Sequence, residues 1–521
     1  MKNKNNYLRT NAKKQAYKNK GITLIALIIT IIVMLILVAV SVNIIINSNI
    51  IGQAEKAAEG YKIAYEQEQT RIDELMEEWN RLEQDQESGC VHNWGEWQTV
   101  TPATCTETGT KTRTCTKCGK VETLTIQALG HNYVSGKCTR CNENEPKETA
   151  KPGIRTDKTL EYESNGKIAW IPNGFTISGI ESEQSIDGGL VIYDIPEGRT
   201  VNWTNPDSVR TQYNQFVWIP VEVNKTTEPK DTETSIASFK RSVWQDNARV
   251  ANNAQSSTSF PSSSDPWSFF TEPYSKDSSD YDGTGTGKTG ISAQITELTK
   301  SIYKYGGFYI GRYEAGSETA RKDGSSQTAA FVVQQDKYPY NYVKWGKGMG
   351  DVSEGAVHLS NSLYTGKTGY GVKSMLCTGA AWDSMLDFIK DSGHNVRSST
   401  SWGNYNNSGF TVYRGRHMYL ASTLAYGWET NDATYGYSVT QDKDTLLTTG
   451  ATERNSSKNI YDVAGNCMEW TTEASGAGYR VLRGGSYRSS GSDSPASGRT
   501  DFGPTDIRFE CSFRPLLYVA L

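Results

Sequence analysis

The feature that most constrains this chain is an uncharged apolar run at residues 22–42, ITLIALIITIIVMLILVAVSV. At the rise of an α-helix, a run of this length spans roughly 31 Å, about the thickness of a bilayer core. Seven Lys or Arg residues and no acidic residue precede the run. The positive-inside rule therefore keeps the N-terminus in the cytoplasm and sends the rest of the chain outside. The sequence predicts a transmembrane helix, with a cleaved secretory signal and a simple membrane anchor as alternatives.

The stretch KNKGITLIAL at residues 18–27 resembles a type IV prepilin leader. The resemblance implies that a prepilin peptidase cleaves between Gly21 and Ile22 and that the chain then joins other pilin-like subunits. Pilins usually carry a glutamate at the fifth position after the cut, and this chain has Ala26 there. Because that glutamate registers subunits in the fibre, the resemblance favours a minor or tip subunit over a major pilin. It implies a single-pass membrane protein that reaches the cell surface or a pilus, with its C-terminal domain outside the cell.

Apolar residues recur at helical spacing after residue 51, at Ile72, Leu75, Trp79 and Leu82. This pattern predicts an amphipathic helix that continues the membrane segment as a rod to about residue 86. The rod is a pilin stalk in one interpretation, and a spacer or dimeric coiled coil in the other. We therefore assign residues 1–21 to the leader and residues 22–88 to the transmembrane and stalk helix.

A cysteine-dense segment at residues 89–142 holds six of the nine cysteines. Its two CxxC pairs, Cys115–Cys118 and Cys138–Cys141, are separated by 19 residues, as in a zinc ribbon. The sequence segments PATCTETGTKTRTCTKCG and ALGHNY resemble repeats on bacterial surface proteins. A segment this small has too little core to fold alone. We expect structural zinc to hold it together, with disulfides as the alternative outside the membrane.

The segment contains enough soft ligands for two tetrahedral zinc sites. The candidates are Cys90, His92, Cys105, Cys115, Cys118, His131, Cys138 and Cys141. Two partitions are open. The first places Cys105, Cys115, Cys118 and His131 in one site and Cys90, His92, Cys138 and Cys141 in the other. The second groups the two CxxC pairs together.

A charged linker at residues 143–158 leads to a last domain at residues 159–521. The domain begins with β-type runs, and a Ser-, Thr- and Asp-rich stretch at about residues 224–300 is typical of a surface insertion. The formal net charge is −4, and the basic leader makes the remainder more acidic still. Nucleic-acid binding is therefore not expected. The phosphate-loop-like DGTGTGKTG lacks the first glycine, which is replaced by Asp282.

The last domain resembles the formylglycine-generating enzyme family, also called the sulfatase-modifying-factor family. The resemblance rests on NIYDVAGNCMEW, YRVLRGGSY and CSFRPLLYV in residues 459–519, and on GGFYIGRYEAG, YPYNYVKW and SMLCTGAAWDSMLDFI before them. It implies an α+β domain of C-type lectin-like fold. The helical face of Trp382, Leu386 and Ile389 is expected to pack against the sheet. The predicted fold class is thus multidomain: an N-terminal transmembrane and stalk helix, a zinc-ribbon-like β module and this α+β domain.

Family enzymes oxidise a substrate cysteine with two copper-binding cysteines a few residues after RGGSY. Those positions are Ser489 and Ser494 in this chain. A serine hydroxyl does not supply the soft thiolate that Cu(I) selects, so neither copper nor catalysis is expected. The three remaining cysteines, Cys377, Cys467 and Cys511, are interpreted as core residues.

The resemblance also implies a calcium site. The family holds the ion at YNxxGNxWEW through two side-chain oxygens and two main-chain carbonyls, and oxygen ligands suit a hard cation. The matching positions are Asp462, Gly465, Cys467 and Glu469. In the alternative interpretation, Asp462 and Glu469 make only turn and arginine contacts.

Binding is the function that the sequence favours. The loop after RGGSY interleaves charged, hydroxyl and aromatic residues, a mixture that suits glycan or protein ligands outside the cell. The candidate ligand-binding residues are Tyr487, Arg488, Asp493, Arg499, Asp501 and Arg508. A Gly- and Asn-rich region adds aromatics of which more than half are expected in the core: Trp402, Tyr405, Tyr413, Tyr419, Tyr426, Trp428, Tyr435 and Tyr437.

The sequence as a whole predicts a surface-displayed, minor pilin-like protein that presents a noncatalytic, lectin-like domain for adhesion or ligand recognition. Two alternatives remain. One is a formylglycine-generating or related oxidase activity in the C-terminal domain, and the other is a structural pseudopilin of a secretion or uptake system.

Overall fold

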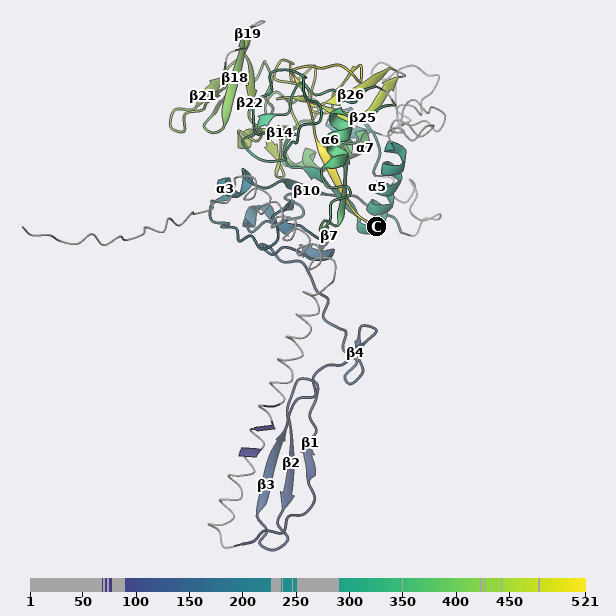
Figure 1. Ribbon diagram of the computed structural model, residues 1–521, viewed down its shortest axis with the longest axis vertical. Coiled ribbons are helices and arrows are strands. Elements are labelled where there is room, and N and C mark those ends of the chain that lie inside the picture. Colours follow the sequence, from purple (N-terminus) through teal and green to yellow (C-terminus); the bar gives the residue numbers. More distant parts are fainter. Residues whose placement is uncertain are drawn as a thin grey trace, which may run out of the picture. The chain divides into compact units, whose positions relative to one another are not determined.

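A computed structural model describes residues 90–521, except 226–235, 237, 246, 251–289, 349, 422–423, 426, 442 and 477, together with Glu68, Arg71, Ile72, Leu75 and Met76. The predicted cleavage point at Gly21 and Ile22 and the apolar run at residues 22–42 lie outside the described residues. None of the helices in the described part is both long and apolar enough to cross a membrane. The chain divides into two compact units, Met1–Pro146 and Lys147–Leu521 (Figure 1).

The described part of the first unit, residues 90–146, is called the cysteine module below. It contains an antiparallel sheet in the order β1-β2-β3 and a small hairpin of β4 and β5. The bounds are β1 Gln98–Thr101, β2 Gly109–Thr114, β3 Val121–Ile126, β4 Tyr133–Val134 and β5 Lys137–Cys138. Alternate residues of β3 are exposed and half-buried. Within residues 90–146 only Cys105, Gly109, Cys115 and Cys138 are buried.

The second unit, called the large unit below, is built on a six-stranded antiparallel sheet in the order β16-β29-β13-β10-β9-β8. The bounds are β8 Thr176–Ile177, β9 Val191–Tyr193, β10 Gln215–Pro220, β13 Gly307–Gly311, β16 Val372–Leu376 and β29 Pro515–Val519. The sequence of strand β10 is apolar throughout because both of its faces are buried. Phe216 and Trp218 join one core, whereas Val217 and Ile219 join a second core on the opposite face.

A second sheet of the large unit has the order β27-β26-β25-β28. Strand β25 pairs antiparallel with β26 and parallel with β28. The bounds are β25 Met468–Gly476, β26 Tyr479–Arg483, β27 Arg499–Phe502 and β28 Cys511–Phe513. The sheet carries part of each C-terminal sequence motif, with MEW of NCMEW on β25, YRVLR of YRVLRGGSY on β26 and CSF of CSFRPLLYV on β28.

Further strand pairs surround the two sheets. Figure 1 shows β18, β19, β21 and β22 as a lobe at one edge of the large unit. The lobe contains β17 Phe410–Val412, β18 Arg416–Ala421, β19 Leu424–Ala425, β20 Glu429–Thr430, β21 Tyr437–Val439 and β22 Asp444–Leu447. The other pairs are β6 Leu160–Ser164 with β7 Lys167–Ile171, β11 Val243–Gln245 with β12 Ala248–Val250, β14 Gly316–Ser317 with β15 Tyr338–Pro339, and β23 Ser456–Ser457 with β24 Ile460–Tyr461.

Four α-helices occur in the described residues: α3 Pro206–Arg210, α5 Ile291–Tyr305, α6 Gly355–Ser362 and α7 Gly379–Ile389. Helix α7 begins where the Thr378 hydroxyl accepts a hydrogen bond from the Ala381 N–H, which is a typical N-cap. Trp382, Leu386 and Ile389 of this helix are buried in the same core as strand residues Ile219 and Leu516. The predicted packing of this helical face against the sheet is confirmed.

The predicted fold class is wrong for the part of the chain that the structure describes. The sequence analysis expected a transmembrane and stalk helix, a β module and an α+β final domain, but the structure consists mostly of β-strands with the four α-helices named above. The physical reason lies in runs such as FVWIP of β10, which are apolar because the sheet is covered on both faces. The α+β class of the final domain was implied by the resemblance, whereas the transmembrane and stalk helices were expected from apolar patterns that lie mostly outside the described residues.

Part of the stretch that the sequence assigns to a surface insertion also enters the fold. Residues 243–250 form the β11–β12 hairpin. Arg241 and Trp244 are buried, and the indole N–H of Trp244 donates to Asp383 Oδ1 at 3.0 Å. Helix α5 begins at Ile291, inside the same stretch. These parts of the insertion therefore contribute core contacts.

Candidate functional site

The cysteine module brings its eight candidate ligands into two groups of four. Cys90, His92, Cys115 and Cys118 form one cluster, and Cys105, His131, Cys138 and Cys141 form the other. Within each cluster the ligand atoms lie within 4.8 Å of one another. Neither partition considered from the sequence has this grouping. The first partition gave each CxxC pair one histidine and one further cysteine, as observed, but assigned Cys105 and His131 to the first pair, where the structure has Cys90 and His92. Three sulfurs and one imidazole nitrogen are a donor set that holds a metal ion tetrahedrally.

Contacts inside each cluster show how the chain positions the ligands. Nδ1 of His92 lies 3.1 Å from Cys118 Sγ, and Nδ1 of His131 lies 3.3 Å from Cys141 Sγ. The Sγ atoms of Cys105 and Cys138 are 3.7 Å apart, well beyond the roughly 2 Å of a disulfide bond. All nine cysteines are free thiols. The thiols of each cluster are thus unpaired by disulfides in the described residues, and their arrangement could hold a metal ion.

The thiols within each cluster differ in acidity. Burial raises the pKa of Cys115, but hydrogen bonds from the backbone N–H groups of Cys118 and Lys117 outweigh it and bring the pKa to about 6. The corresponding balance brings the pKa of Cys138 to about 5, whereas burial and the neighbouring thiols raise the pKa of Cys105 to about 12. In each cluster the lowered pKa of one thiol favours the thiolate form that a metal ion binds, and a bound dication would displace the protons of the other thiols.

The carboxylate of Glu143 lies near the imidazole ring of His131. Nε2 of His131 lies 3.5 Å from Glu143 Oε2, on the opposite side of the ring from the nitrogen that faces the sulfurs. A partner of this kind fixes the tautomer and the ring orientation of a metal-binding histidine. The Glu143 contact thus prepares Nδ1 of His131 as the ligand atom.

In the large unit, the loop after RGGSY is closed at its base by two arginines on neighbouring strands. Arg483 of β26 pairs in register with Arg499 of β27. Arg483 donates to Asp383 Oδ1 at 2.7 Å, and Arg499 donates to Asp383 Oδ2 at 2.8 Å and to Glu473 Oε1 at 2.6 Å. Both carboxylates are fully buried. Burial alone would raise the pKa of Asp383, but the two guanidinium groups hold it well below its usual range.

The serines at the expected copper positions make local contacts. The Ser489 hydroxyl accepts from the Ser486 N–H at 3.2 Å, and the Ser494 N–H donates to the Ser490 carbonyl at 2.9 Å. Cys377, Cys467 and Cys511 are buried, as expected of core residues. Burial raises the pKa of Cys467 and of Cys511 well above the usual thiol value.

The positions expected to bind calcium make turn and arginine contacts. Asp462 Oδ2 accepts from the Gly450 N–H at 2.7 Å, and Asp462 and Gly465 adopt positive φ angles in a turn. Both oxygens of Glu469 accept from Arg514, at 2.6 and 2.9 Å. Burial raises the pKa of Asp462 to about 6 and that of Glu469 to about 7, although Arg514 opposes the shift. Cys467 lies beside Met468, the first residue of β25. The observed contacts are those of the alternative interpretation.

The candidate ligand-binding residues fall into two groups. Tyr487 is fully buried, and Arg499 belongs to the ion pairs with Asp383 and Glu473, so these two side chains support the loop from below. Arg488, Asp493, Asp501 and Arg508 reach the surface. Arg488 pairs with Asp444 at 3.0 Å and Arg508 lies over the Phe502 ring at 3.9 Å.

The predicted aromatic region is divided between core and surface. Trp402 and Tyr405 are buried, Tyr419, Trp428 and Tyr437 are half-buried, and Tyr426 lies outside the described residues. Tyr413 and Tyr435 are 54% and 84% exposed. Sequence reasoning did not separate these classes, because strand register decides which ring faces the core.

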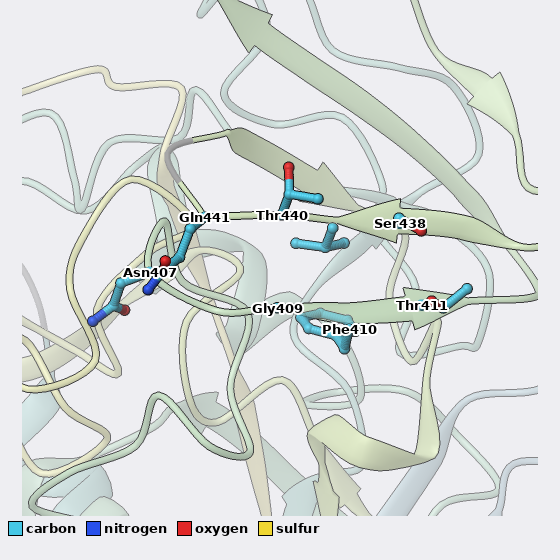
Figure 2. A pocket seen from close by; sticks show the side chains of 8 residues that line it. Asn407, Gly409, Phe410, Thr411, Ser438, Thr440 and Gln441 are labelled. Atoms are coloured by element: carbon cyan, nitrogen blue, oxygen red, sulfur yellow. The ribbon is translucent and has the colours of Figure 1, made fainter.

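A shallow depression of about 490 Å³ lies beside the loop after RGGSY. Figure 2 shows that its side chains come from β17, β21 and the adjoining loops. The lining residues are Asn407, Gly409, Phe410, Thr411, Ser438, Val439, Thr440 and Gln441. Asn407 connects the two features, since its Nδ2 donates to Ser490 Oγ at 3.2 Å and its Oδ1 accepts from the Gly491 N–H at 3.1 Å. Sequence reasoning missed this depression.

Comparisons with known proteins give little further guidance. No family model matches the chain, and no curated protein sequence matches it. Among solved structures, the chain is similar to the crystal structure of CarF at 16% identity and a TM-score of 0.25, covering 41% of this chain and 87% of that one. It is also similar to Treponema denticola variable protein 1 at 12% identity and a TM-score of 0.21, covering 40% of this chain and 84% of that one. Both TM-scores are too low to support an argument about fold or function.

Proposed function

We propose that this chain is a noncatalytic recognition protein displayed outside the cell on a pilin-like anchor. The observation that carries the proposal is the chemistry of the loop after RGGSY. Ser489 and Ser494 stand where the resemblance to formylglycine-generating enzymes expects copper thiolates, and the three cysteines of the large unit are buried. The loop and the neighbouring depression offer hydrogen-bonding groups at the surface instead of a reactive thiolate. Recognition is the task that such a surface supports.

The direct test of this proposal is an oxidation assay on the full chain. The chain would be incubated with Cu(I), oxygen and a peptide containing one cysteine, and the peptide would be followed by mass spectrometry. We expect no conversion of the cysteine to formylglycine and no stoichiometric Cu(I) binding to the large unit. A time-dependent conversion of the peptide cysteine would overturn the noncatalytic assignment and establish the oxidase alternative.

The proposed display rests on the leader sequence and is tested separately. Cleavage between Gly21 and Ile22 by a prepilin peptidase would leave Ile22 as the mature N-terminus, which N-terminal sequencing detects. Substitution of Gly21→Val should block processing while membrane insertion continues. If the mature chain begins elsewhere, the chain is anchored by another route. If deletion of residues 159–521 leaves adhesion unchanged and only assembly requires the chain, the structural pseudopilin alternative is favoured.

We further propose that each Cys3His cluster of the cysteine module binds one zinc ion in a structural role. The support is the donor set, three sulfurs and one imidazole nitrogen, which matches structural zinc sites. No open coordination position is needed, since four protein ligands complete a tetrahedron. Metal analysis of the full chain should give two zinc ions per molecule. Substitution of Cys118→Ser should remove one of them, and a wild-type ratio near zero with all thiols oxidised would contradict the assignment.

Calcium at residues 462–469 is a separate proposal with its own measurement. The main-chain carbonyls of Gly465 and Cys467 and the Asp462 carboxylate would supply the oxygen ligands, while Glu469 would have to loosen its contacts to Arg514. A calcium titration followed by the melting temperature tests this. An increase in melting temperature that disappears in the Asp462→Ala variant supports calcium binding at this site. An unchanged melting temperature at millimolar calcium contradicts the proposal.

A further inference from the structure

The paired strands β17 and β21 present two chemically different faces. Their register pairs Phe410 with Val439, Thr411 with Ser438 and Val412 with Tyr437. Because successive side chains of a strand point to opposite faces, Val412 and Val439 reach the small core with Leu447 and Ala451. Thr411 and Ser438 therefore point to the other face. Thr440 follows Ser438 with the same alternation and extends the row of hydroxyl groups.

The aromatic ring of Tyr413 lies at one end of this row of hydroxyl groups. Tyr413 follows β17 on the same face as Thr411 and is 54% exposed. A Cβ atom placed on Gly436, opposite it, would lie 3.0 Å from two Tyr413 ring atoms and 2.4 Å from Thr411 Cγ2. One side of the ring therefore lies close to the glycine, beside the threonine. A side chain at position 436 would crowd Thr411 and the ring, so the glycine leaves room for both.

The depression continues this face towards the loop after RGGSY. None of its lining residues is ionisable. They supply hydroxyls from Thr411, Ser438 and Thr440 and amides from Asn407 and Gln441 (Figure 2). Gly409 forms part of the wall, and a Cβ atom built on it meets no atom within 4 Å. The space beside Gly409 is thus open to a ligand.

We infer that this face, from the Tyr413 ring to the depression at Gly409, binds a neutral saccharide; the inference rests on the proposed recognition function and names its ligand class. Hydroxyl and amide groups both donate and accept hydrogen bonds, as the hydroxyls of a sugar do. An aromatic ring supplies the flat apolar area on which the C–H face of a sugar ring packs. Acidic glycans and nucleic acids need cationic partners, and none lines the depression.

The test uses the full chain in detergent on an array of neutral glycans built from glucose, galactose, mannose and N-acetylhexosamines, with sulfated glycans and arrayed peptides as further arms. Gly409→Phe should fill the depression without disturbing its neighbours and should abolish neutral-glycan binding. Gly478→Phe is the matched control, since position 478 also has nothing within 4 Å of a built Cβ and lies at the β25–β26 turn. It should bind like the wild type.

The ring is tested by a matched pair of tyrosines. Tyr413→Ala should weaken binding about tenfold, because an aromatic contact contributes about 1.4 kcal/mol. Tyr479→Ala removes a ring of nearly the same exposure, 55%, from the start of β26 and should leave binding unchanged. Thr411→Val and Ser438→Ala remove one hydroxyl each and should each reduce the affinity severalfold.

Three outcomes would overturn the inference, and they bear differently on the proposed function. Binding of neutral glycans that survives Gly409→Phe places the sugar elsewhere and leaves recognition intact. Binding only of sulfated glycans or peptides also leaves recognition intact but rejects the neutral-saccharide class. Blank arrays for the wild type reject the inference, and blank arrays together with formylglycine production reject the proposed function as well.

Discussion

The cysteine module and the large unit differ in the kind of side chain that each of them buries. In the module, three of the four buried residues are cysteines of the two candidate metal-binding clusters, and the fourth is Gly109. The large unit instead buries two extensive apolar cores and five arginine side chains, each nearly or completely inaccessible. In the comparison, a segment whose buried side chains could hold metal ions stands beside a segment folded by hydrophobic burial and buried ion pairs.

The strands of the module expose apolar side chains that the large unit would bury. Val100 of β1 and Val121 of β3 are 62% and 59% exposed. The contacts above this sheet are cation–π contacts, with Arg113 lying 4.9 Å from the centre of the Trp94 ring and 4.6 Å from that of Trp97. Contacts of this kind at exposed sites contribute about 0.5–1 kcal/mol each. They cannot replace an apolar core, which leaves the clusters as the main stabilising interaction.

The largest expected effect is therefore removal of metal from the module. A structural zinc ion contributes roughly 10–16 kcal/mol of apparent binding free energy at neutral pH. Chelation of the full chain should abolish hydrogen-exchange protection in β2, residues 109–114, while protection of β10, residues 215–220, stays unchanged. If β2 kept its protection after complete chelation, metal binding would not be what stabilises the module.

The next largest effect concerns a buried carboxylate of the large unit. Asp383→Ala leaves Arg483 and Arg499 without one of their two acidic partners, and breaking a buried pair in this way costs about 3–5 kcal/mol. Chemical denaturation of the large unit measures the loss. The control is Asp187→Ala, because the ion pair of Asp187 with Lys167 is about half exposed and should contribute at most about 1 kcal/mol. Equal losses in the two variants would contradict the prediction.

A third prediction concerns acid stability. Burial raises the pKa of Glu183, but Arg312 and Arg210 outweigh it and bring the pKa to about 2, below the ordinary 4.5. A carboxylate with a lowered folded-state pKa stabilises the fold above its unfolded pKa, and this contribution is lost as pH falls from 4.5 towards 2. The contribution is on the order of 3 kcal/mol.

The free energy of unfolding of the large unit, measured from pH 6 to pH 2, checks this prediction. Glu183→Gln should be less stable than the wild type at pH 6, and the difference should shrink as the pH falls. A difference that stays constant over this range would show that Glu183 acts through packing and not through its charge.

The smallest effect is expected at the surface of the module. Val121→Thr exchanges one β-branched residue for another at an exposed strand position, and surface substitutions of this kind usually change stability by less than about 0.5 kcal/mol. Val217→Thr in β10 makes the same exchange at a fully buried position and should cost about 1–3 kcal/mol. Hydrogen exchange of the two strands measures both changes. A large loss at Val121 would mean that the module depends on apolar packing.

The sequence predicted the ligands of the clusters but not their pairing. Spacing fixes each CxxC pair, since two residues between cysteines place both sulfurs on one metal ion. It does not fix which histidine or distant cysteine completes each site. That choice depends on the β1–β3 sheet, where an isolated bridge between Trp94 and Cys115 brings residues 90–92 beside the first CxxC pair.

The large unit was predicted less completely, for a related reason. The ion pairs at the base of the RGGSY loop join Arg241, Asp383, Glu473, Arg483 and Arg499, which are far apart in the sequence. Only the arginine of RGGSY gave a sequence signal. Arg499 and Tyr487 were expected at a ligand surface because charged and aromatic residues alternate there, but a single sequence does not distinguish a side chain that supports a loop from one that is displayed on it.

The order of ligands along the cysteine module has a mechanical consequence. The first cluster uses residues 90, 92, 115 and 118, and the second uses residues 105, 131, 138 and 141, so the two sets interleave. A pulling force applied between Cys90 and Cys141 would pass through metal–ligand bonds in both clusters before it could unravel the strands. With both metal ions bound, the tension between the clusters is carried by residues 92–105, 105–115 and 118–131 in parallel, and not by the whole intervening chain, which is about 170 Å long when fully extended. Loss of the ions would turn the module from an inextensible link into a compliant tether.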